Sequence, residues 1–340
     1  MISYADVIVD LQAGDTGKGK VAHALAKDYD MVLRYNGGAN AGHTVYHNGQ
    51  KIVTHQVPIG VLFGIPSVIG LGCVVDTGKL QDEIRELNSV GINTKGLIFI
   101  DKRAHAVQSK HREEDSSESK IGTTRQGIGP AYRDKYGRTG MRMEELYKFS
   151  PALHDEFYSV IDVYELFHNK HNDWRILCEG AQGFQIDIDW GDYPYVTSSH
   201  CTVGSAILNG IPPQRIADVI GVMKAYETYS GSKTTFQDEN DPMLAKIQEV
   251  GNEFGATTGR KRKVRWLNLD GVIKAINING VTELIINKAD VLEQVGVFKY
   301  VYNQTLHEVF TLEEFRRDID AIIMNRCDLG VNWSMTPNGI

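Results

Sequence analysis

What this sequence lacks argues against three classes of function. It has four cysteines, far apart and without a Cys-x-x-Cys spacing, so neither a structural zinc site nor a disulfide framework is indicated. No stretch approaches the ~20 consecutive apolar residues of a membrane span. Basic residues are not in excess, because 36 lysines and arginines face 43 aspartates and glutamates, for a formal net charge of -7. We therefore expect a cytoplasmic protein that acts on small molecules, without a nucleic-acid or membrane partner.

The spacing of apolar residues predicts an α/β fold with a largely parallel central sheet flanked by helices. Short apolar runs cover residues 7–9, 32–33, 68–75, 97–100, 176–178, 219–222 and 284–286. Asp76 and Thr311 stand where they could cap helices. We expect a single domain over residues 1–340 with loop and helical insertions, including an exposed excursion at about 108–145 that opens with the polar stretch 108–120.

The glycine-rich segment 14–20 (Gly-Asp-Thr-Gly-Lys-Gly-Lys) predicts a P-loop-like phosphate cradle after the first strand. Glycines let backbone N–H groups approach an anion, the following helix adds its positive end, and Lys18 or Lys20 adds a full charge. Val21 stands where a Walker motif has the hydroxyl that binds magnesium. A metal here needs another ligand, and the loop carboxylate Asp15 is the candidate.

Three further loops are rich in small residues that bring backbone close to a ligand. Residues 34–44 contain Asn40 and His43, and an imidazole there can donate to an oxygen that gains negative charge. Residues 122–132 combine threonine hydroxyls with glycines, and arginines follow them. Residues 179–199 place Gln182 and Thr197 after a strand, which suits recognition of a base and a phosphate.

Two segments near the C-terminus have more than one interpretation. Residues 255–263 put four cations behind two threonines, which fits a solvated or RNA-binding face, or a loop whose arginines clamp a small dicarboxylate. Residues 287–290 form Asn-Lys-x-Asp after an apolar run, where the Asp290 carboxylate could accept two N–H groups of guanine. With the phosphate loop, this motif leaves a nucleotide-switch GTPase open as a non-enzyme alternative, although Val21 opposes it.

In their order along the chain, these loops resemble those of adenylosuccinate synthetases. The matching motifs include Asn-Ala-Gly-His-Thr, Glu-Gly-Ala-Gln-Gly, Tyr-Pro-Tyr-Val-Thr-Ser-Ser and Gly-Ala-Thr-Thr-Gly-Arg. The resemblance implies ligation of L-aspartate to C6 of a purine monophosphate, driven by hydrolysis of a nucleoside triphosphate with Mg²⁺. The match to Asp15 would remove the N1 proton, and the match to His43 would act as an acid on the phosphate donor. Phosphorylation of O6 comes first, because an oxo group is a poor leaving group.

The resemblance assigns a role to each matching position. These are Asp15, His43 and Lys18 for catalysis; Thr16, Asn40, Thr123, Thr124, Arg138, Gln182 and Thr197 for the purine monophosphate; Gly14, Gly17, Lys18, Gly19, Lys20, Gly42, His43, Thr44, Asn287, Lys288 and Asp290 for the triphosphate; Gly255, Thr257, Thr258, Arg260 and Arg262 for L-aspartate; and Asp15 with Gly42 for Mg²⁺. In the family the residue matching Arg138 reaches the neighbouring subunit's site, which implies a homodimer.

Departures from the family pattern indicate a particular substrate. The family has Trp-Gly-Asp-Glu in the phosphate loop, whereas this chain has Ala13 and Thr16 at the first and last of these positions. These changes resemble the phage branch of the family, which converts dGMP to a succino-precursor of diaminopurine deoxynucleotide, and Thr16 offers a hydroxyl for the 2-amino group. If the chain is viral, it would act in the host cytoplasm. Ordinary ligation of IMP with GTP is the alternative, and ATP or dATP is the donor that the resemblance favours.

Overall fold

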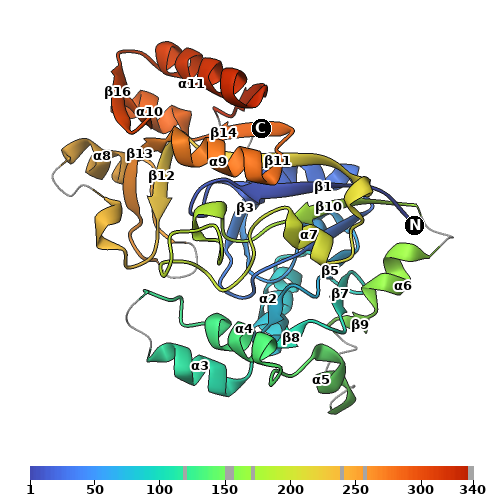
Figure 1. Ribbon diagram of the computed structural model, residues 1–340. Coiled ribbons are helices and arrows are strands. Elements are labelled where there is room, and N and C mark those ends of the chain that lie inside the picture. The colour runs from blue at the N-terminus through green and yellow to red at the C-terminus, as the bar shows by residue number, and fades with distance from the viewer. Residues whose placement is uncertain (118–120, 150–156, 170–172, 238–240, 256–258, 336–340) are drawn as a thin grey trace.

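The computed structural model describes residues 1–117, 121–149, 157–169, 173–237, 241–255 and 259–335. Its centre is a nine-stranded sheet in the order β17-β14-β11-β1-β10-β2-β5-β7-β9 (Figure 1). Every neighbouring pair in this sheet is parallel. Its strands are β1 (Ile2–Asp10), β2 (Met31–Arg34), β5 (Ser67–Ile69), β7 (Ile98–Asp101), β9 (Ser159–Ile161), β10 (Trp174–Glu179), β11 (Ile216–Lys224), β14 (Glu283–Asn287) and β17 (Val331–Trp333).

Both faces of the central sheet are buried. Along β1, Val7 and Val9 belong to one buried apolar cluster, whereas Ile8 belongs to the other, as the two-residue period of a strand requires. Helices supply much of the cover. They are α1 (Lys18–Leu25), α2 (Thr77–Ser89), α3 (Ser109–Ser116), α4 (Ile128–Gly137), α5 (Met143–Phe149), α6 (Val163–His168), α7 (Gly204–Leu208), α8 (Pro242–Val250), α9 (Leu269–Asn279), α10 (Ala289–Val295) and α11 (Leu312–Cys327). The expected α/β fold with a parallel sheet is confirmed.

Three small sheets complete the described part of the chain. A four-stranded sheet runs β12-β13-β15-β16, and two-stranded sheets pair β3 with β4 and β6 with β8. Their bounds are β3 (His43–His47), β4 (Gln50–Thr54), β6 (Val74–Val75), β8 (His105–Ala106), β12 (Tyr226–Tyr229), β13 (Lys263–Asn268), β15 (Phe298–Tyr302) and β16 (Thr305–Val309). The hairpin of β3 and β4 packs on α1, which brings His43 to the phosphate loop.

The apolar run 68–75 is not one strand, as the sequence analysis treated it. It divides into β5 and β6, which belong to different sheets, and the turn between them contains Gly70 and Gly72. A Cβ atom at Gly70 would lie 2.0 Å from Oδ1 of Asn209, and one at Gly72 would lie 2.1 Å from the carbonyl oxygen of Tyr35. These close approaches explain why the run contains glycines, and a hydrophobicity profile does not detect them.

The stretch 108–120 is not simply an exposed excursion. Residues 118–120 lie outside the described part, but α3 forms from Ser109 onward and buries His111 and Asp115. Both buried side chains have partners, because His111 lies 3.1 Å from Asp134 and Asp115 accepts hydrogen bonds from Thr123 and Gly127. The expected helix caps are confirmed, since Asp76 accepts from the Lys79 N–H and Thr311 from the Glu314 N–H.

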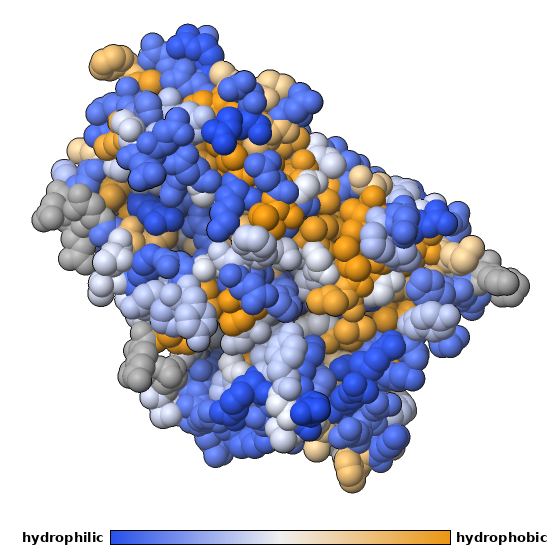
Figure 2. Space-filling model, viewed as in Figure 1, coloured by the Kyte–Doolittle hydropathy of each residue, from blue (hydrophilic) through white to orange (hydrophobic). Residues whose placement is uncertain are grey.

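The face of the molecule shown in Figure 2 carries both polar residues and apolar areas. Hydrophobic residues gather across the middle of the face in Figure 2, and α7, which lies there in Figure 1, exposes Ile207 and Leu208. No helix in the described ranges has both the length and the apolar character needed to span a bilayer.

Candidate active site

The phosphate loop is organised around a buried carboxylate at the end of β1. Oδ1 of Asp10 accepts from the N–H groups of Gln12 (2.9 Å) and Gly14 (3.3 Å). Oδ2 accepts from the Thr16 hydroxyl (2.5 Å) and from Nζ of Lys18 (2.8 Å). The loop is therefore held in shape before any nucleotide binds, and Lys18 is tied to it by a buried ion pair.

The two lysines of the loop differ in environment. Lys18 is buried against Asp10, whereas Lys20 is partly exposed and donates to the Ser334 hydroxyl at 2.6 Å. Burial lowers the pKa of Lys20 to about 8, although the charge of Asp290 acts in the opposite direction. An arriving polyphosphate would compensate this desolvation.

Asp15 lies at the mouth of the loop in a left-handed backbone conformation, with φ 59°. The side chain of Asp15 is 32% exposed. It forms an ion pair with Arg262, whose Nε lies 2.8 Å from Oδ2 of Asp15. Arg262 also donates from Nη1 to the buried Glu253 at 2.6 Å. The hydroxyl of Ser230 is 3.4 Å from the same Asp15 oxygen. The proposed base and a proposed aspartate-binding arginine thus meet directly.

His43 is buried beside two charged residues from the central sheet. Its Nδ1 lies 2.5 Å from Oε1 of Glu179, and the same oxygen accepts from Nη2 of Arg34 at 2.9 Å. Burial and the neighbouring Arg34 lower the pKa of His43 to about 4. Burial alone would raise the pKa of Glu179, but Arg34 and His43 outweigh it and lower the value to about 2.

The helix α1 needs glycine where it passes His43. A Cβ atom at Gly19 would lie 2.7 Å from the Cβ of His43, closer than real side chains approach. Gly17 precedes the helix with φ 99°, a conformation that favours glycine. Asn287 seals the loop by donating to the carbonyl of Thr16 at 2.9 Å.

The predicted purine-binding residues come from separate loops. Gln182 has φ 58° and lies against the phosphate loop, because a Cβ at Gly14 would contact its backbone at 3.9 Å. Its buried Nε2 has no hydrogen-bond partner among the described residues, so it is free to bind a ligand oxygen. The N–H of Thr197 donates to the carbonyl of Ile186 at 2.8 Å, which fixes its backbone against the loop that follows Gln182. Asn40 accepts from the Gly38 N–H within its own loop.

The threonine loop and the basic segment meet each other. Nη1 of Arg260 donates to the carbonyl of Gly122 at 2.7 Å. Thr123 donates to Asp115, and Thr124 is half-buried nearby in sequence. Arg138 ends α4 in a left-handed conformation and is exposed. Thr257 and Thr258 lie outside the described residues.

The basic segment is not a continuous solvated face. Besides Arg260 and Arg262, Lys263 also turns inward and donates to the carbonyl of Lys233 at 2.6 Å. Gly255 closes the loop by donating to the carbonyl of Arg260 at 2.8 Å. The RNA-binding interpretation loses its basis, because a phosphate backbone requires accessible cations.

Two residues of the Asn-Lys-x-Asp motif form hydrogen bonds within the protein itself. Asn287 seals the phosphate loop, and Lys288 donates to the carbonyl of Gly251 at 3.0 Å. Asp290 is partly buried within electrostatic range of Lys20. Of the motif, Asp290 remains the candidate for contacting a base. Gly42 and Thr44 flank His43 and are at least partly exposed.

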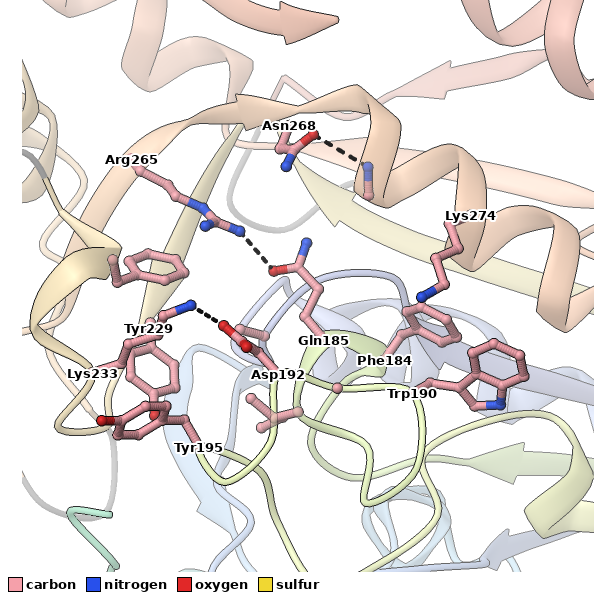
Figure 3. Close-up of a pocket in the computed structure, with 15 residues that line it drawn as sticks. Phe184, Gln185, Trp190, Asp192, Tyr195, Tyr229, Lys233, Arg265, Asn268 and Lys274 are labelled. Atoms are coloured by element: carbon pink, nitrogen blue, oxygen red, sulfur yellow. Dashed lines mark hydrogen bonds and ion pairs between the residues drawn. The ribbon is translucent and has the colours of Figure 1, made fainter. Parts of the chain in front are cut away.

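A pocket of about 220 Å³ opens beside Ala13 (Figure 3). Ile186 and Tyr229 pack with Ala13 at one side of it, and Lys233 contacts Asp192 across its edge. Arg265 stacks 4.2 Å over Phe236 and is paired with the buried Glu227. Ala13, which has a small side chain, lines this pocket, so the space beside the phosphate loop is open.

Among the described residues, one cluster could in principle hold a metal ion: Asp187, Asp189 and His200. Asp187 is already used structurally, because its oxygens accept from the N–H groups of Asp189, Trp190 and Cys201. Asp15 is better suited to Mg²⁺, which favours one or two carboxylates together with phosphate oxygens.

Sequence reasoning did not identify the groups that organise this site. Asp10, Arg34, Glu179 and Glu253 were not assigned roles, although three of them stand at the ends of strands β1, β2 and β10. The available signal for these groups was a charged residue at the end of an apolar run, because such a residue stands at the carboxyl end of a buried strand. Arg34 and Glu179 are partners although they lie 145 positions apart, whereas the partners of Asp10 lie within eight positions of it.

Comparisons with known proteins agree with this geometry. Residues 7–172 and 152–322 match the family model described as adenylosuccinate synthetase. The adenylosuccinate synthetase of Chlorobium phaeobacteroides is 39% identical over 337 residues, which cover 86% of this chain and 78% of the relative. That of Chlorobium chlorochromatii is 40% identical over 345 residues, with 87% and 78% covered.

Two solved structures share the fold. Fully ligated adenylosuccinate synthetase from Plasmodium falciparum superposes with a TM-score of 0.85 at 27% identity, covering 99% of this chain and 98% of the other. Succinoaminodeoxyadenylate synthetase from cyanophage S-2L, bound to dGMP and dATP, has a TM-score of 0.78 at 24% identity over 99% and 94%, which bears on the fold alone. From the family match and these relatives, the chain belongs to the adenylosuccinate synthetase family, and it is a carbon–nitrogen ligase.

Proposed function

We propose that this ligase joins L-aspartate to C6 of dGMP, with hydrolysis of ATP or dATP to the diphosphate and phosphate. The observation that carries the proposal is the pair of small residues at the phosphate loop, Ala13 and Thr16. The Thr16 hydroxyl donates its proton to Asp10, so its remaining lone pairs can only accept a hydrogen bond. A 2-amino group on the purine donates one, whereas IMP carries only a C–H at that position.

The open space beside Ala13 supports the same choice. A pocket lined in part by Ala13 lies beside the phosphate loop, and alanine leaves more room there than the tryptophan that the resemblance gives for the family. The cyanophage synthetase, which shares this fold, is bound to dGMP and dATP. The resemblance of the loops to the phage branch favours ATP or dATP as the donor, and Asp290 keeps GTP as the alternative.

The chemistry follows from two group transfers. Asp15 takes the N1 proton, O6 attacks the γ-phosphorus, and the bond to the β–γ bridging oxygen breaks to release the diphosphate. The amine of L-aspartate then attacks C6, the C6–O6 bond breaks, and phosphate leaves with O6. Lys18 and the loop N–H groups would stabilise the charge on the transferring group, while His43 acts on the phosphate donor. Gln182 can bind O6 through its free Nε2.

A bound Mg²⁺ would neutralise phosphate charge during the transfer. The Asp15 carboxylate, partly exposed at the loop mouth, would hold it together with the Gly42 carbonyl. Arg260 and Arg262, with Thr257 and Thr258, would bind the aspartate carboxylates. Arg138 would complete the monophosphate site of a second copy in a homodimer.

The test offers dGMP, GMP and IMP in turn, each with L-aspartate, Mg²⁺ and one of ATP, dATP or GTP. Phosphate release that depends on aspartate is measured as kcat/KM for each combination. We expect the highest value for dGMP with ATP or dATP. A preference for IMP would assign the chain to ordinary adenylosuccinate synthesis, and release that ignores aspartate would exclude the ligase reaction.

A further inference from the structure

We propose that Glu179 is the positioning residue for His43, holding the imidazole by Nδ1 so that Nε2 is the nitrogen presented to the phosphate donor. The proposal rests on the proposed role of His43 in phosphoryl transfer. It adds a residue that touches neither nucleotide nor aspartate and acts through the histidine alone.

The parallel register of the central sheet brings the three groups together. Glu179, the last residue of β10, is the direct partner of Arg34, the last residue of β2. The hairpin strand β3 begins at His43 and leans against α1. Two neighbouring strand ends therefore place a carboxylate and a guanidinium beneath one imidazole.

The hydrogen bonds determine the tautomer. Both oxygens of Glu179 are engaged, Oε1 by Arg34 (2.9 Å) and His43 (2.5 Å), and Oε2 by the N–H of Ile59 (2.9 Å). An ionised carboxylate only accepts, so the proton of the 2.5 Å contact belongs to Nδ1 of His43. Nη2 of Arg34 lies 3.3 Å from the same Nδ1 and is itself a donor, so it cannot replace that acceptor. In the neutral ring Nε2 then carries no proton and can only accept, so His43 acts as an acid on the phosphate donor only when the ring is protonated, a charge that Glu179 would balance.

Burial makes the arrangement rigid. Glu179, Arg34 and His43 are 0%, 2% and 6% exposed. Because Gly19 packs on the Cβ of His43, the ring has little freedom about χ1. Comparable outer partners of functional histidines fix the tautomer and orientation of the ring.

A second buried glutamate provides a matched control. Glu83 is 6% exposed and accepts from the N–H groups of His55 (2.7 Å), Gln56 (2.9 Å) and Val57 (3.2 Å). Glu83 holds the backbone of residues 55–57, and Glu179 holds the backbone nearby at Ile59, but among the described residues Glu83 forms no hydrogen bond with His43. Glu83→Gln thus reproduces the backbone-anchoring part of Glu179→Gln without the contacts to the imidazole and to Arg34.

The experiment combines ¹⁵N NMR of histidine-labelled protein with kinetics on both variants. The His43 signal is assigned by its loss in His43→Gln. We expect the Nδ1–H tautomer in the unsubstituted protein and its loss in Glu179→Gln, with kcat reduced about 10- to 100-fold and KM for all three substrates changed less than about threefold. Glu83→Gln should keep both the tautomer and kcat.

A neutral His43 ring with its proton on Nε2 in the unsubstituted protein would overturn the proposal before any variant is made. Equal losses of kcat and melting temperature in both variants would also overturn it, since Glu179 would then only anchor the backbone. Absence of aspartate-dependent phosphate release in the unsubstituted protein would instead refute the proposed function, and the NMR result would still decide whether Glu179 sets the tautomer.

Discussion

The two sides of the site are built differently. On the phosphate-donor side, Asp10 and Glu179 are buried and saturated with hydrogen bonds, and they hold Lys18 and His43 in place. On the aspartate side, Arg262 joins Asp15, which is one-third exposed.

The comparison indicates where this chain is preorganised. Phosphoryl transfer gains from fixed charges that cost no rearrangement during the reaction, and the buried side supplies them. The Asp15–Arg262 pair must open when substrates arrive, because both members are assigned ligands of their own. We therefore expect substitutions on the buried side to lower kcat and substitution of Arg262 on the exposed side to raise KM. Asp15 is the exception on the exposed side, because it is also the proposed base.

The largest effect is expected for Asp15→Asn, which removes the proposed base. Turnover should fall at least about 10³-fold, since an amide cannot take the N1 proton. The melting temperature should change little because the side chain is partly exposed. Steady-state phosphate release and a thermal melt check both parts, with Asp82→Asn as a control on another exposed carboxylate. Near-normal turnover would remove Asp15 from the base role.

Gly19→Ala should disturb the buried, phosphate-donor side of the site by displacing His43. The new methyl group meets the Cβ of His43 at 2.7 Å, so the imidazole must move, and we expect kcat to fall about 10²-fold. Gly78→Ala is the matched control, because Gly78 also lies in the first turns of a helix and its nearest neighbour would be 3.6 Å away. Equal kinetics for the two variants would show that the contact at Gly19 has no catalytic consequence.

Arg262→Lys should break the exposed side. Lysine keeps the charge but cannot bridge Asp15 and Glu253 with two nitrogens. KM for aspartate should rise about 10- to 50-fold with a smaller change in kcat. Lys261→Gln, at the exposed neighbouring position, should leave both constants unchanged. A pure loss of kcat in Arg262→Lys would contradict the division between the two sides.

Thr16→Val should sharpen the assignment of substrate. Removing the hydroxyl should lower the ratio of kcat/KM for dGMP to that for IMP by about 10-fold, because one hydrogen bond to the 2-amino group is lost. Thr16→Ser keeps the hydroxyl and should preserve the ratio. An unchanged ratio in Thr16→Val would mean that Thr16 does not read the 2-amino group.

The smallest effect concerns pH. The pKa of Lys20 is lowered to about 8, so the ammonium is charged below that pH and neutral above it. KM for the triphosphate should therefore rise a few-fold as the pH increases from 7 to 9. In Lys20→Met this rise should disappear. A rise of the same size in Lys20→Met would place the titrating group elsewhere.

The sequence was sufficient to predict those parts of the fold and of the site that depend on short, local motifs. The apolar runs located β1, β2, β7, β10, β11 and β14 but not β9 or β17. The glycine-rich segment 14–20 follows β1 and leads into α1 as expected. The prediction of one strand over residues 68–75 was wrong. The chain turns between β5 and β6 where Gly70 lies against Asn209, a residue distant in sequence.

The partners that hold the site could not be predicted for a related reason. Glu179 was visible as part of a motif, but its contact with His43 depends on which strands are neighbours in the sheet. Strand order places β10 beside β2 even though about 140 residues separate them in sequence. The spacing of apolar residues predicts whether a segment is a helix or a strand, but it does not predict which strands are neighbours in the sheet.

The most direct test follows the O6 oxygen. dGMP labelled with ¹⁸O at C6 is incubated with L-aspartate, Mg²⁺ and ATP, and the released phosphate is analysed by mass spectrometry. Phosphorylation of O6 followed by its displacement predicts one ¹⁸O atom in each phosphate for every aspartate joined. Phosphate without ¹⁸O would mean that water, not the purine oxygen, receives the phosphoryl group, and the account would be wrong.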